Sequence, residues 1–137
     1  MPLDLWRYFC KDIESEPISQ DEAMWISNAT YSNHIFADPY EGECHKYDVC
    51  SMFPSIMMSK YAYFPMKRGA FFKADDLGEY YREDIKRYKQ GIYRCIISDG
   101  DVKLWRSNKR NYYTNIDLNR AQELMLNIEL IKDDQPN

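Results

Sequence analysis

The chain has 137 residues, of which 45% are hydrophobic and 29% are charged. This length is enough for one domain with one core, and the composition is that of a globular protein, which excludes an intrinsically disordered chain. No apolar run approaches the ~20 residues of a membrane span, and the N-terminus lacks the pattern of a secretory signal. We therefore expect a single intracellular domain over residues 1–137, with no membrane segment.

The net charge of −4 hides an uneven distribution. Residues 1–59 carry a net charge of −7, residues 60–110 carry +6 and residues 111–137 carry −3. A basic middle in an acidic chain can attract phosphate, although solvated Lys and Arg side chains are common on any protein surface. The residues that we consider as nucleic-acid contacts are Lys67, Arg68, Lys73, Arg106, Lys109 and Arg110.

The spacing of the cysteines indicates that their thiols are reduced. They are scattered along the chain, whereas disulfide frameworks and zinc ribbons use short paired spacings. The four are Cys10, Cys44, Cys50 and Cys95. Cys44, His45 and Cys50 could form part of a metal site, but no C-x-x-C pair or fourth ligand accompanies them. Ordinary strand residues are the favoured interpretation.

The first thirty residues predict a helical lead-in. Apolar residues recur at helical spacing over 3–13, and glutamates and a proline end the pattern. Ser19 and Glu22 then form a capping-box sequence, in which each side chain can satisfy the other's backbone N–H. We expect this second helix to run to about Asn28.

A β-hairpin followed by a short helix is predicted for residues 31–66. Residues 31–36 read as one strand, and the sequence DPYEG at 38–42 has the proline and glycine of a turn. The return strand would be 44–50, where apolar and polar residues alternate. The helix would follow over 53–61, with a proline in its first turn.

The strongest helix signal lies over residues 75–88, after an extended segment at 70–73. Acidic residues stand at its start and basic residues at its end, which suits the helix dipole. Four apolar residues fall on one face. They are Leu77, Tyr81, Ile85 and Tyr88.

A second hairpin and a last helix complete the predicted fold. Residues 92–98 and 102–106 are rich in β-branched and aromatic residues and flank an Asp-Gly turn. The last helix begins after Asp117, with a polar tail after Lys132. Its inward residues would be Leu118, Ala121, Leu124, Met125 and Ile128. The fold class predicted is α+β, a small antiparallel sheet with helices packed on one side.

One short motif carries a resemblance to a known family. Residues 47–58 read YDVCSMFPSIMM, with an aspartate at the predicted strand end and Ser, Pro, Ser and Ile at fixed offsets behind it. This resembles the D-x-x-S-L-Y-P-S-I motif of the palm of family B DNA polymerases, with Phe53 in the place of the tyrosine. The alternative is that a lone aspartate after a strand caps the following turn or helix.

The resemblance implies a role for each matched residue. Asp48 would be the catalytic metal ligand for Mg²⁺, and Val49 would add its backbone carbonyl. Ser51 and Met52 would face the nucleotide phosphates through their backbone, and Phe53 would pack under the sugar. The arrangement is physically reasonable, because a carboxylate beside a helix N-terminus brings a cation and a phosphate to one corner.

The likeness extends to the protein-primed members of this family, which occur in phages and linear plasmids. Their upstream Tyr-x-Gly-Gly segment has its nearest equivalent at residues 31–34, where both glycines are missing. Their downstream insertion, which contacts the terminal protein and DNA, is similar in layout to residues 67–132. Asp117 and Leu118 sit where the S/T-N-x-D-L helix entry of that insertion would be. Residues 31–66 would then be a palm-like strand-turn-helix.

Two further motifs of the family are missing from the chain. Neither the Y-x-D-T-D hairpin with the second metal-binding carboxylate nor the K-x-x-x-N-S-x-Y-G fingers helix occurs. We therefore predict a fragment or remnant of a DNA-directed DNA polymerase that does not catalyse nucleotidyl transfer alone. Its partners would be DNA or the remainder of a polymerase. The alternatives are a stand-alone non-catalytic protein that binds a protein partner or nucleic acid, and an unrelated α+β domain.

Overall fold

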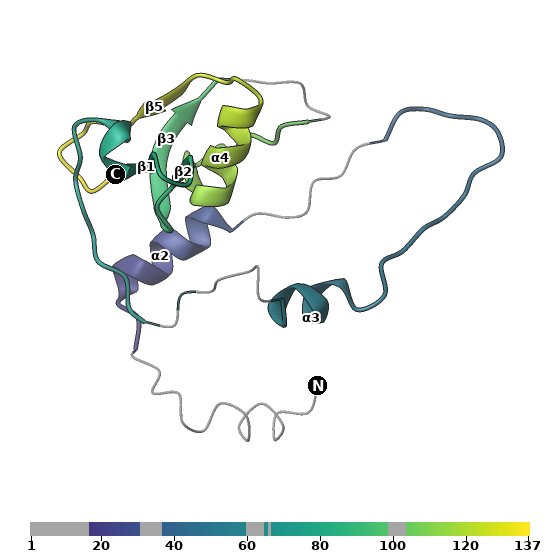
Figure 1. Cartoon of the computed structure of the whole chain (residues 1–137), viewed down its shortest axis with the longest axis horizontal. Helices are drawn as coiled ribbons and strands as arrows, with labels where there is room; N and C mark the ends of the chain where they lie inside the picture. The colour runs from purple at the N-terminus through teal and green to yellow at the C-terminus, as the bar shows by residue number, and fades with distance from the viewer. Residues whose placement is uncertain (1–16, 31–36, 60–64, 66, 99–103) are drawn as a thin grey trace. The chain divides into compact units, whose positions relative to one another are not determined.

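The structure, a computed structural model, describes residues 17–30, 37–59, 65, 67–98 and 104–137. The chain divides into two compact units. The first includes Asp38–Arg68, and the second includes Ile18–Ala37 and Gly69–Asn137. That the whole chain makes up one domain stays a prediction. Figure 1 shows the helices and strands of both units.

The second unit begins with the helix α2 (Gln20–Ala29), which confirms the prediction for this segment. Ser19 is its N-cap, and the Ser19 hydroxyl accepts a hydrogen bond from the backbone N–H of Glu22 at 3.1 Å. Oε1 of Glu22 accepts a hydrogen bond from the backbone N–H of Gly69 at 2.8 Å. The start of α2 therefore also fixes a residue far along the chain. The helix predicted over 3–13 lies outside the described residues.

The centre of the second unit is a three-stranded antiparallel sheet in the order β4-β3-β5. The strand β3 (Ile92–Ile97) was predicted, and its β-branched and aromatic residues suit a pleated, half-buried position. The strand β4 (Tyr112–Thr114) pairs with its first half, with Tyr93 opposite Tyr113. The strand β5 (Ile128–Leu130) pairs with its second half.

The predicted partner of β3 is wrong in the part that the structure describes. Residues 104–106 form no strand, and β4 and β5 pair with β3 instead. Trp105 is buried and stacks on Tyr113, with ring centroids 5.9 Å apart. The indole ring buries a large apolar area in the core, which outweighs the few ladder bonds of so short a strand.

The helix α4 (Asn115–Glu123) covers one face of this sheet. Alternate residues of a strand point to the same face, so the odd-numbered residues of β3 lie together beneath the helix. Leu118 and Ala121 of α4 are fully buried against them. The core consists of Tyr93, Cys95, Ile97, Trp105, Tyr113, Leu118 and Ala121.

The end of α4 corrects the predicted last helix, which was expected to bury residues up to Ile128. The N–H of Met125 donates to the carbonyl of Gln122, and the N–H of Leu126 donates to that of Ala121, both at 3.0 Å. With Met125 in the left-handed region at φ 56°, this is the Schellman arrangement that ends helices. Glycine usually occupies that position, so the sequence showed no stop signal. Met125 is exposed, and Ile128 begins β5 instead.

The helix predicted over 75–88 is wrong. Its first part is a single 3₁₀ turn, η1 (Leu77–Tyr80), which Asp76 and Glu79 start with the reciprocal hydrogen bonds of a capping box. The chain then forms a hairpin of two short strands, β1 (Tyr81–Arg82) and β2 (Arg87–Tyr88).

Aromatic pairing explains why the hairpin forms in place of the helix. Tyr81 and Tyr88 stand opposite each other across the strands, with an edge-to-face ring contact at 5.1 Å. The ring of Tyr88 also contacts the ring of Tyr93 in the core, with centroids 6.2 Å apart. Ile85, which a helix would have buried, lies in the turn and is 50% exposed. The spacing that was expected to form one face of a helix therefore places Tyr81 and Tyr88 in contact across two strands.

Side chains of the loop after Trp105 form hydrogen bonds with the last carbonyls of α2. The side-chain amide of Asn108 donates to the carbonyl of Asn28 at 2.8 Å and to that of Tyr112 at 2.6 Å. Nη1 of Arg110 donates to the carbonyl of Ser27 at 3.2 Å. Carbonyls at a helix end lack partners within the helix, so these long-range donors satisfy them.

The polar residues after Lys132 are tied to the second unit. Asn137 is buried, and its side chain both donates to the carbonyl of Ala74 and accepts from its N–H, each at 2.9 Å. Asp133 forms an ion pair with Arg94, with Nη1 of Arg94 2.8 Å from Oδ1 of Asp133. A segment that reads as a polar tail is therefore part of the packing.

The first unit contains one described helix, α3 (Met52–Met57), shorter than the one predicted over 53–61. The return strand expected over 44–50 is wrong, because those residues are not in any strand of the structure. A strand needs a hydrogen-bonded neighbour, and the predicted neighbour, 31–36, lies outside the described residues.

The fold class α+β is confirmed by these small antiparallel sheets and helices. Trp25 of α2 contacts Tyr112, with ring centroids 5.2 Å apart, and so meets the sheet through a residue that alternates with the core residue Tyr113. None of the helices in the described ranges has the length and apolar character that crossing a membrane requires.

Candidate functional site

The polymerase-like motif forms a tight turn that leads into α3. The backbone N–H of Met52 donates to the carbonyl of Val49 at 3.3 Å, which reverses the chain between these residues. Ser51, the N-cap of α3, is in the left-handed region at φ 53°, and its side chain makes no capping hydrogen bond. Asp48 lies just before this turn with its side chain exposed. The motif therefore has the turn and the helix of the prediction without its strand.

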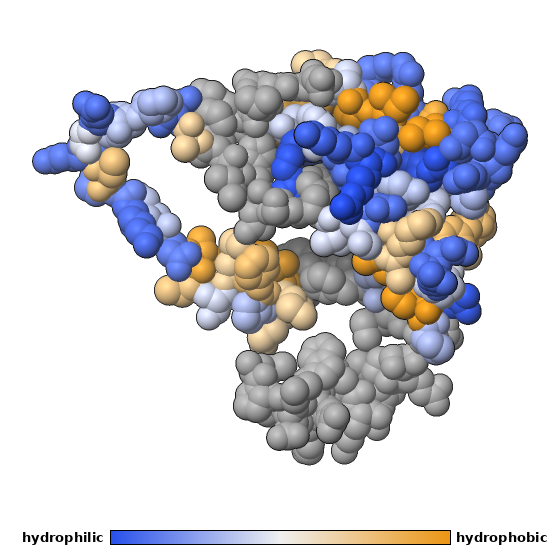
Figure 2. All heavy atoms as spheres, turned by 180° about the vertical axis from the view of Figure 1, so that it is seen from behind, coloured by the Kyte–Doolittle hydropathy of each residue, from blue (hydrophilic) through white to orange (hydrophobic). Residues whose placement is uncertain are grey.

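Apolar side chains on and after α3 are exposed. Phe53 is 65% exposed, Ile56 is 47% exposed and Met57 is 58% exposed. Figure 2 shows weakly and strongly apolar side chains gathered over this helix. Single exposed apolar residues are normal, but a contiguous group of them is typical of a surface that another body covers.

The described residues of the first unit do not fit a magnesium site by themselves. Across the described ranges, no group of three or more His, Cys, Asp or Glu side chains is placed to hold a metal ion. Divalent magnesium and calcium are held by several oxygen ligands. Asp48 supplies one carboxylate, and the Val49 carbonyl already accepts a hydrogen bond. A complete site would need further oxygen ligands from elsewhere.

In the structure, Cys44 and His45 contact neighbouring residues of their own segment. Sγ of Cys44 lies 3.7 Å from the carbonyl of Gly42, to which it donates a weak hydrogen bond. The His45 ring lies beside that of Tyr47, with centroids 6.3 Å apart. Cys44 and Cys50 are exposed.

The six basic residues predicted as nucleic-acid contacts do not belong to one element. Lys67 and Arg68 fall in the first unit, and the other four fall in the second. Lys73 pairs with Asp134 at 2.9 Å, and this hydrogen bond raises the pKa of Lys73. Arg110 is bonded to the end of α2, Arg106 is half-buried and Lys109 is exposed. Lys73 and Arg110 therefore also have structural contacts.

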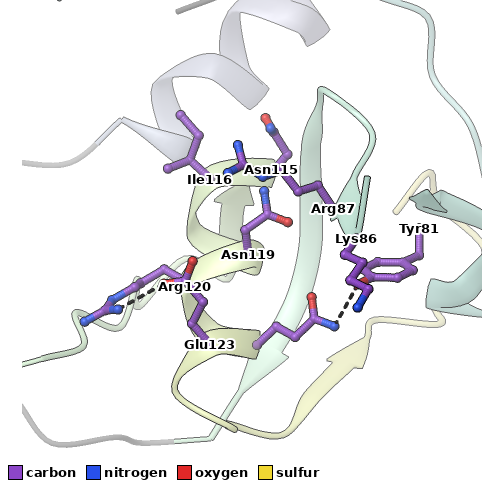
Figure 3. A pocket seen from close by; sticks show the side chains of 9 residues that line it. Tyr81, Lys86, Arg87, Asn115, Ile116, Asn119, Arg120 and Glu123 are labelled. Carbon is purple, nitrogen blue, oxygen red and sulfur yellow. Dashed lines mark hydrogen bonds and ion pairs between the residues drawn. The ribbon is translucent and has the colours of Figure 1, made fainter. Parts of the chain in front are cut away.

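The second unit has a pocket of about 600 Å³ between the β1–β2 hairpin and α4. Figure 3 shows the side chains of the hairpin and those of the helix on either side of it. The residues that line it are Tyr81, Lys86, Arg87, Asn115, Ile116, Asn119, Arg120, Gln122 and Glu123.

Hydrogen bonds hold the helix side of the pocket in place. Oδ1 of Asn119 accepts from the backbone N–H of Tyr88 at 3.0 Å, which joins α4 to the hairpin. Nε2 of Gln122 donates to the hydroxyl of Tyr81 at 3.3 Å (Figure 3). These two bonds orient both amides by contacts to the opposite wall.

The charges of the pocket are unequal on its two sides. On the helix, Arg120 and Glu123 form an ion pair at 3.0 Å, so their charges offset each other. On the hairpin, Lys86 and Arg87 are both exposed. The hairpin side therefore presents two positive charges.

No protein-family model, curated protein or solved structure matches the chain. The likeness of residues 47–58 to a polymerase palm therefore rests on the residues of the motif.

The pocket was not predicted from the sequence. Lys86 and Arg87 were expected to stand at the end of a helix, where basic residues complement the dipole. In the structure, Lys86 is in the left-handed region at φ 52°, and it leads the chain from the turn into β2. The signal that could have found the hairpin is the pair of tyrosines at 81 and 88, which suits a four-residue turn as well as a helix face.

Proposed function

We propose that the chain is a part of a protein-primed family B DNA-directed DNA polymerase that acts only with the remainder of the palm. Five characteristic residues of the palm motif support this origin. They are Asp48, Ser51, Pro54, Ser55 and Ile56. Asp48 would be the metal-binding aspartate, and the partner polypeptide would supply the second carboxylate and the fingers helix.

The exposed apolar face of α3 is the observation that carries the proposal. Fully burying an aliphatic or aromatic side chain of this size contributes about 1.5–3 kcal/mol. Phe53, Ile56 and Met57 leave much of that contribution unused in the structure. In the proposed complex, α3 would pack on the remainder of the palm. A complementary fragment that covers this face would gain affinity from it and bring its own carboxylate near Asp48.

A complementation assay tests this function. The full chain is mixed with a polypeptide that carries the second carboxylate hairpin and fingers helix of a protein-primed family B polymerase, with primer, template, deoxynucleotides and magnesium. We expect incorporation with the wild-type chain and its loss with Asp48→Ala. The matched control is Glu43→Gln, which removes another exposed carboxylate of the same unit and should keep the activity.

Two results would contradict the proposal. One is no incorporation although the two polypeptides form a complex. The other is equal incorporation by the wild-type chain and Asp48→Ala. A complex that forms with the wild-type chain but not with Ile56→Asp would show that the apolar face of α3 mediates the association.

A second candidate is a stand-alone non-catalytic protein that keeps the palm-derived turn as a scaffold and binds nucleic acid or a protein partner. The observation that favours it is the core of the second unit, whose described residues all belong to that unit. Binding to single-stranded or double-stranded DNA should weaken steeply with salt. If neither DNA binds at low salt, a protein partner is the remaining form of this candidate.

A further inference from the structure

The pocket between the β1–β2 hairpin and α4 contains two cations that the described part of the protein leaves unpaired. No hydrogen bond or ion pair within the described ranges engages the side chain of Lys86 or of Arg87. The carboxylate of Asp84, in the same turn, is bound by Arg82 through two hydrogen bonds. Two adjacent cations without an ion-pair partner in the described residues, at the wall of a pocket, favour an anionic ligand.

The opposite wall offers polar groups with a fixed direction. Because Oδ1 of Asn119 is occupied by the N–H of Tyr88, its side-chain NH₂ remains available as a donor. Because Nε2 of Gln122 is occupied by the hydroxyl of Tyr81, its Oε1 remains available as an acceptor. One donor and one acceptor on neighbouring helix turns suit the polar edge of a heterocyclic base.

The size and the apolar part of the lining favour an organic ligand over a bare ion. A volume of about 600 Å³ falls in the range of sites for small organic ligands. Ile116 is 73% exposed and the ring of Tyr81 is half-buried, so both offer apolar surface to a ligand. The ligand should therefore carry an organic body as well as a charged group.

We propose that this pocket binds a small phosphorylated ligand of the size and chemistry of a nucleoside monophosphate. The phosphate would lie against Lys86 and Arg87, and the base would meet the amides of Asn119 and Gln122. Arginine suits this role because its planar guanidinium can hold two phosphate oxygens at once. The proposal requires neither Asp48 nor the remainder of a polymerase, so it stands independently of the proposed function.

A titration of the isotope-labelled full chain with adenosine monophosphate, followed by NMR, tests the proposal. We expect saturable shifts centred on the backbone amides of residues 86, 87, 119 and 122. Adenosine without the phosphate should bind about tenfold more weakly, because hydrogen bonds to a charged group are lost. Inorganic phosphate should perturb residues 86 and 87 without affecting 119 and 122.

Variants distinguish binding in the pocket from nonspecific electrostatic attraction of the ligand to the protein surface. Arg87→Gln should weaken binding of adenosine monophosphate about tenfold. Lys132→Gln, which removes an exposed cation outside the pocket, should leave the affinity unchanged. If Arg87→Gln does not keep the spectrum of the folded chain, Lys86→Gln takes its place with the same expectation.

Three results would overturn the proposal. The first is an absence of shifts at the hairpin and α4 up to millimolar adenosine monophosphate. The second is an equal loss of affinity in Arg87→Gln and Lys132→Gln. The third is that a single-stranded oligonucleotide binds with shifts centred on Lys109 and Arg110 while the mononucleotide leaves the pocket unchanged, which would assign phosphate binding to a different surface.

Discussion

The helices α3 and α4 show how differently the two units of this chain are built. In α4, Thr114 and Asp117 close a reciprocal capping box, and Leu118 is fully buried under the helix. In α3, the N-cap Ser51 makes no side-chain hydrogen bond, and Ile56 is 47% exposed. The residues that resemble the palm motif are therefore not the residues that form the core of the second unit.

Helix length sharpens this contrast. An isolated helix shorter than about 12–15 residues is marginal in water, so short helices depend on packing. The nine residues of α4 obtain that packing from the sheet. The six residues of α3 have no buried side chain in the structure. A helix in this condition is stabilised most effectively by a partner that covers it, which agrees with the proposed role of the unit as part of a larger site.

Thiol reactivity should show the largest difference between the two units. Cys50 is exposed beside α3, whereas Cys95 is fully buried in β3, where burial raises the pKa of its thiol to about 12. The thiolate is the reactive form, so at pH 8 Cys95 should react with iodoacetamide at least about a hundredfold more slowly than Cys50. Peptide mapping by mass spectrometry after timed quenching measures each site separately.

Denaturant provides the control for this labelling experiment. In urea above the unfolding transition, both cysteines should react at similar rates, because the burial of Cys95 is lost. Equal rates in native buffer would contradict the assignment of Cys95 to a closed core. Protection of Cys50 would show that the α3 region is covered in solution.

Truncating one apolar side chain should lower the free energy of unfolding much more in α4 than in α3. Leu118→Ala removes a fully buried side chain and should lower the free energy of unfolding by about 2–5 kcal/mol. Ile56→Ala should change it by less than about 0.5 kcal/mol, since the side chain is already half exposed. Urea unfolding followed by circular dichroism measures both, because each unit contains a helix.

A variant at an exposed position of α4 is the matched control for this experiment. Ile116→Ala lies in the same helix, but the side chain is 73% exposed, so a loss confined to Leu118→Ala reports on burial and not on helix propensity. Similar losses in Leu118→Ala and Ile56→Ala would show instead that α3 is as well packed as α4.

The sequence predicted those elements whose signals are local. The N-cap Ser19 marked the start of α2, and the β-branched and aromatic run from Ile92 marked β3. It failed where the signal was shared between two structures. The spacing of Tyr81 and Tyr88 fits a helix face and also a cross-strand pair, and only their contact with Tyr93 decides between the two.

Strand pairing and chain ends were missed for a different reason. The partners of β3 were assigned by proximity in the sequence, whereas β5 lies more than thirty residues away along the chain and α4 comes between them. The helix stop at Met125 carries no glycine, and the contacts of Asn137 with Ala74 join residues that no local pattern connects. Tertiary contacts of this kind cannot be read from local propensity.

The two candidate sites also differ in whether a local sequence signal indicates them. The motif around Asp48 was found because its residue types stand at fixed offsets in one segment. The pocket with Lys86 and Arg87 joins a hairpin to a helix from another part of the sequence, so its members share no spacing that could have indicated it.

The ion pair of Arg94 with Asp133 should give the smallest measurable effect, as a dependence of stability on pH. Hydrogen bonds from Arg94 hold the pKa of Asp133 below its ordinary value of 3.8. A carboxyl group with a lowered pKa in the folded state stabilises the fold above its unfolded-state pKa, and this stabilisation is lost as the pH falls through the folded-state pKa. We expect Asp133→Asn to lose less stability than the wild type between about pH 4 and pH 2.

Asp134 offers the matched control for this measurement. Its pKa is also lowered, by Lys73, but the Asp134 side chain is fully exposed and solvent screens such a pair. Urea unfolding of the wild type, Asp133→Asn and Asp134→Asn at pH 5 and at pH 3 compares the two ion pairs directly. An equal change of pH dependence in both variants would mean that the burial of Arg94 does not strengthen its pair. A change in Asp133→Asn alone would place the segment after Lys132 among the contacts that stabilise the second unit.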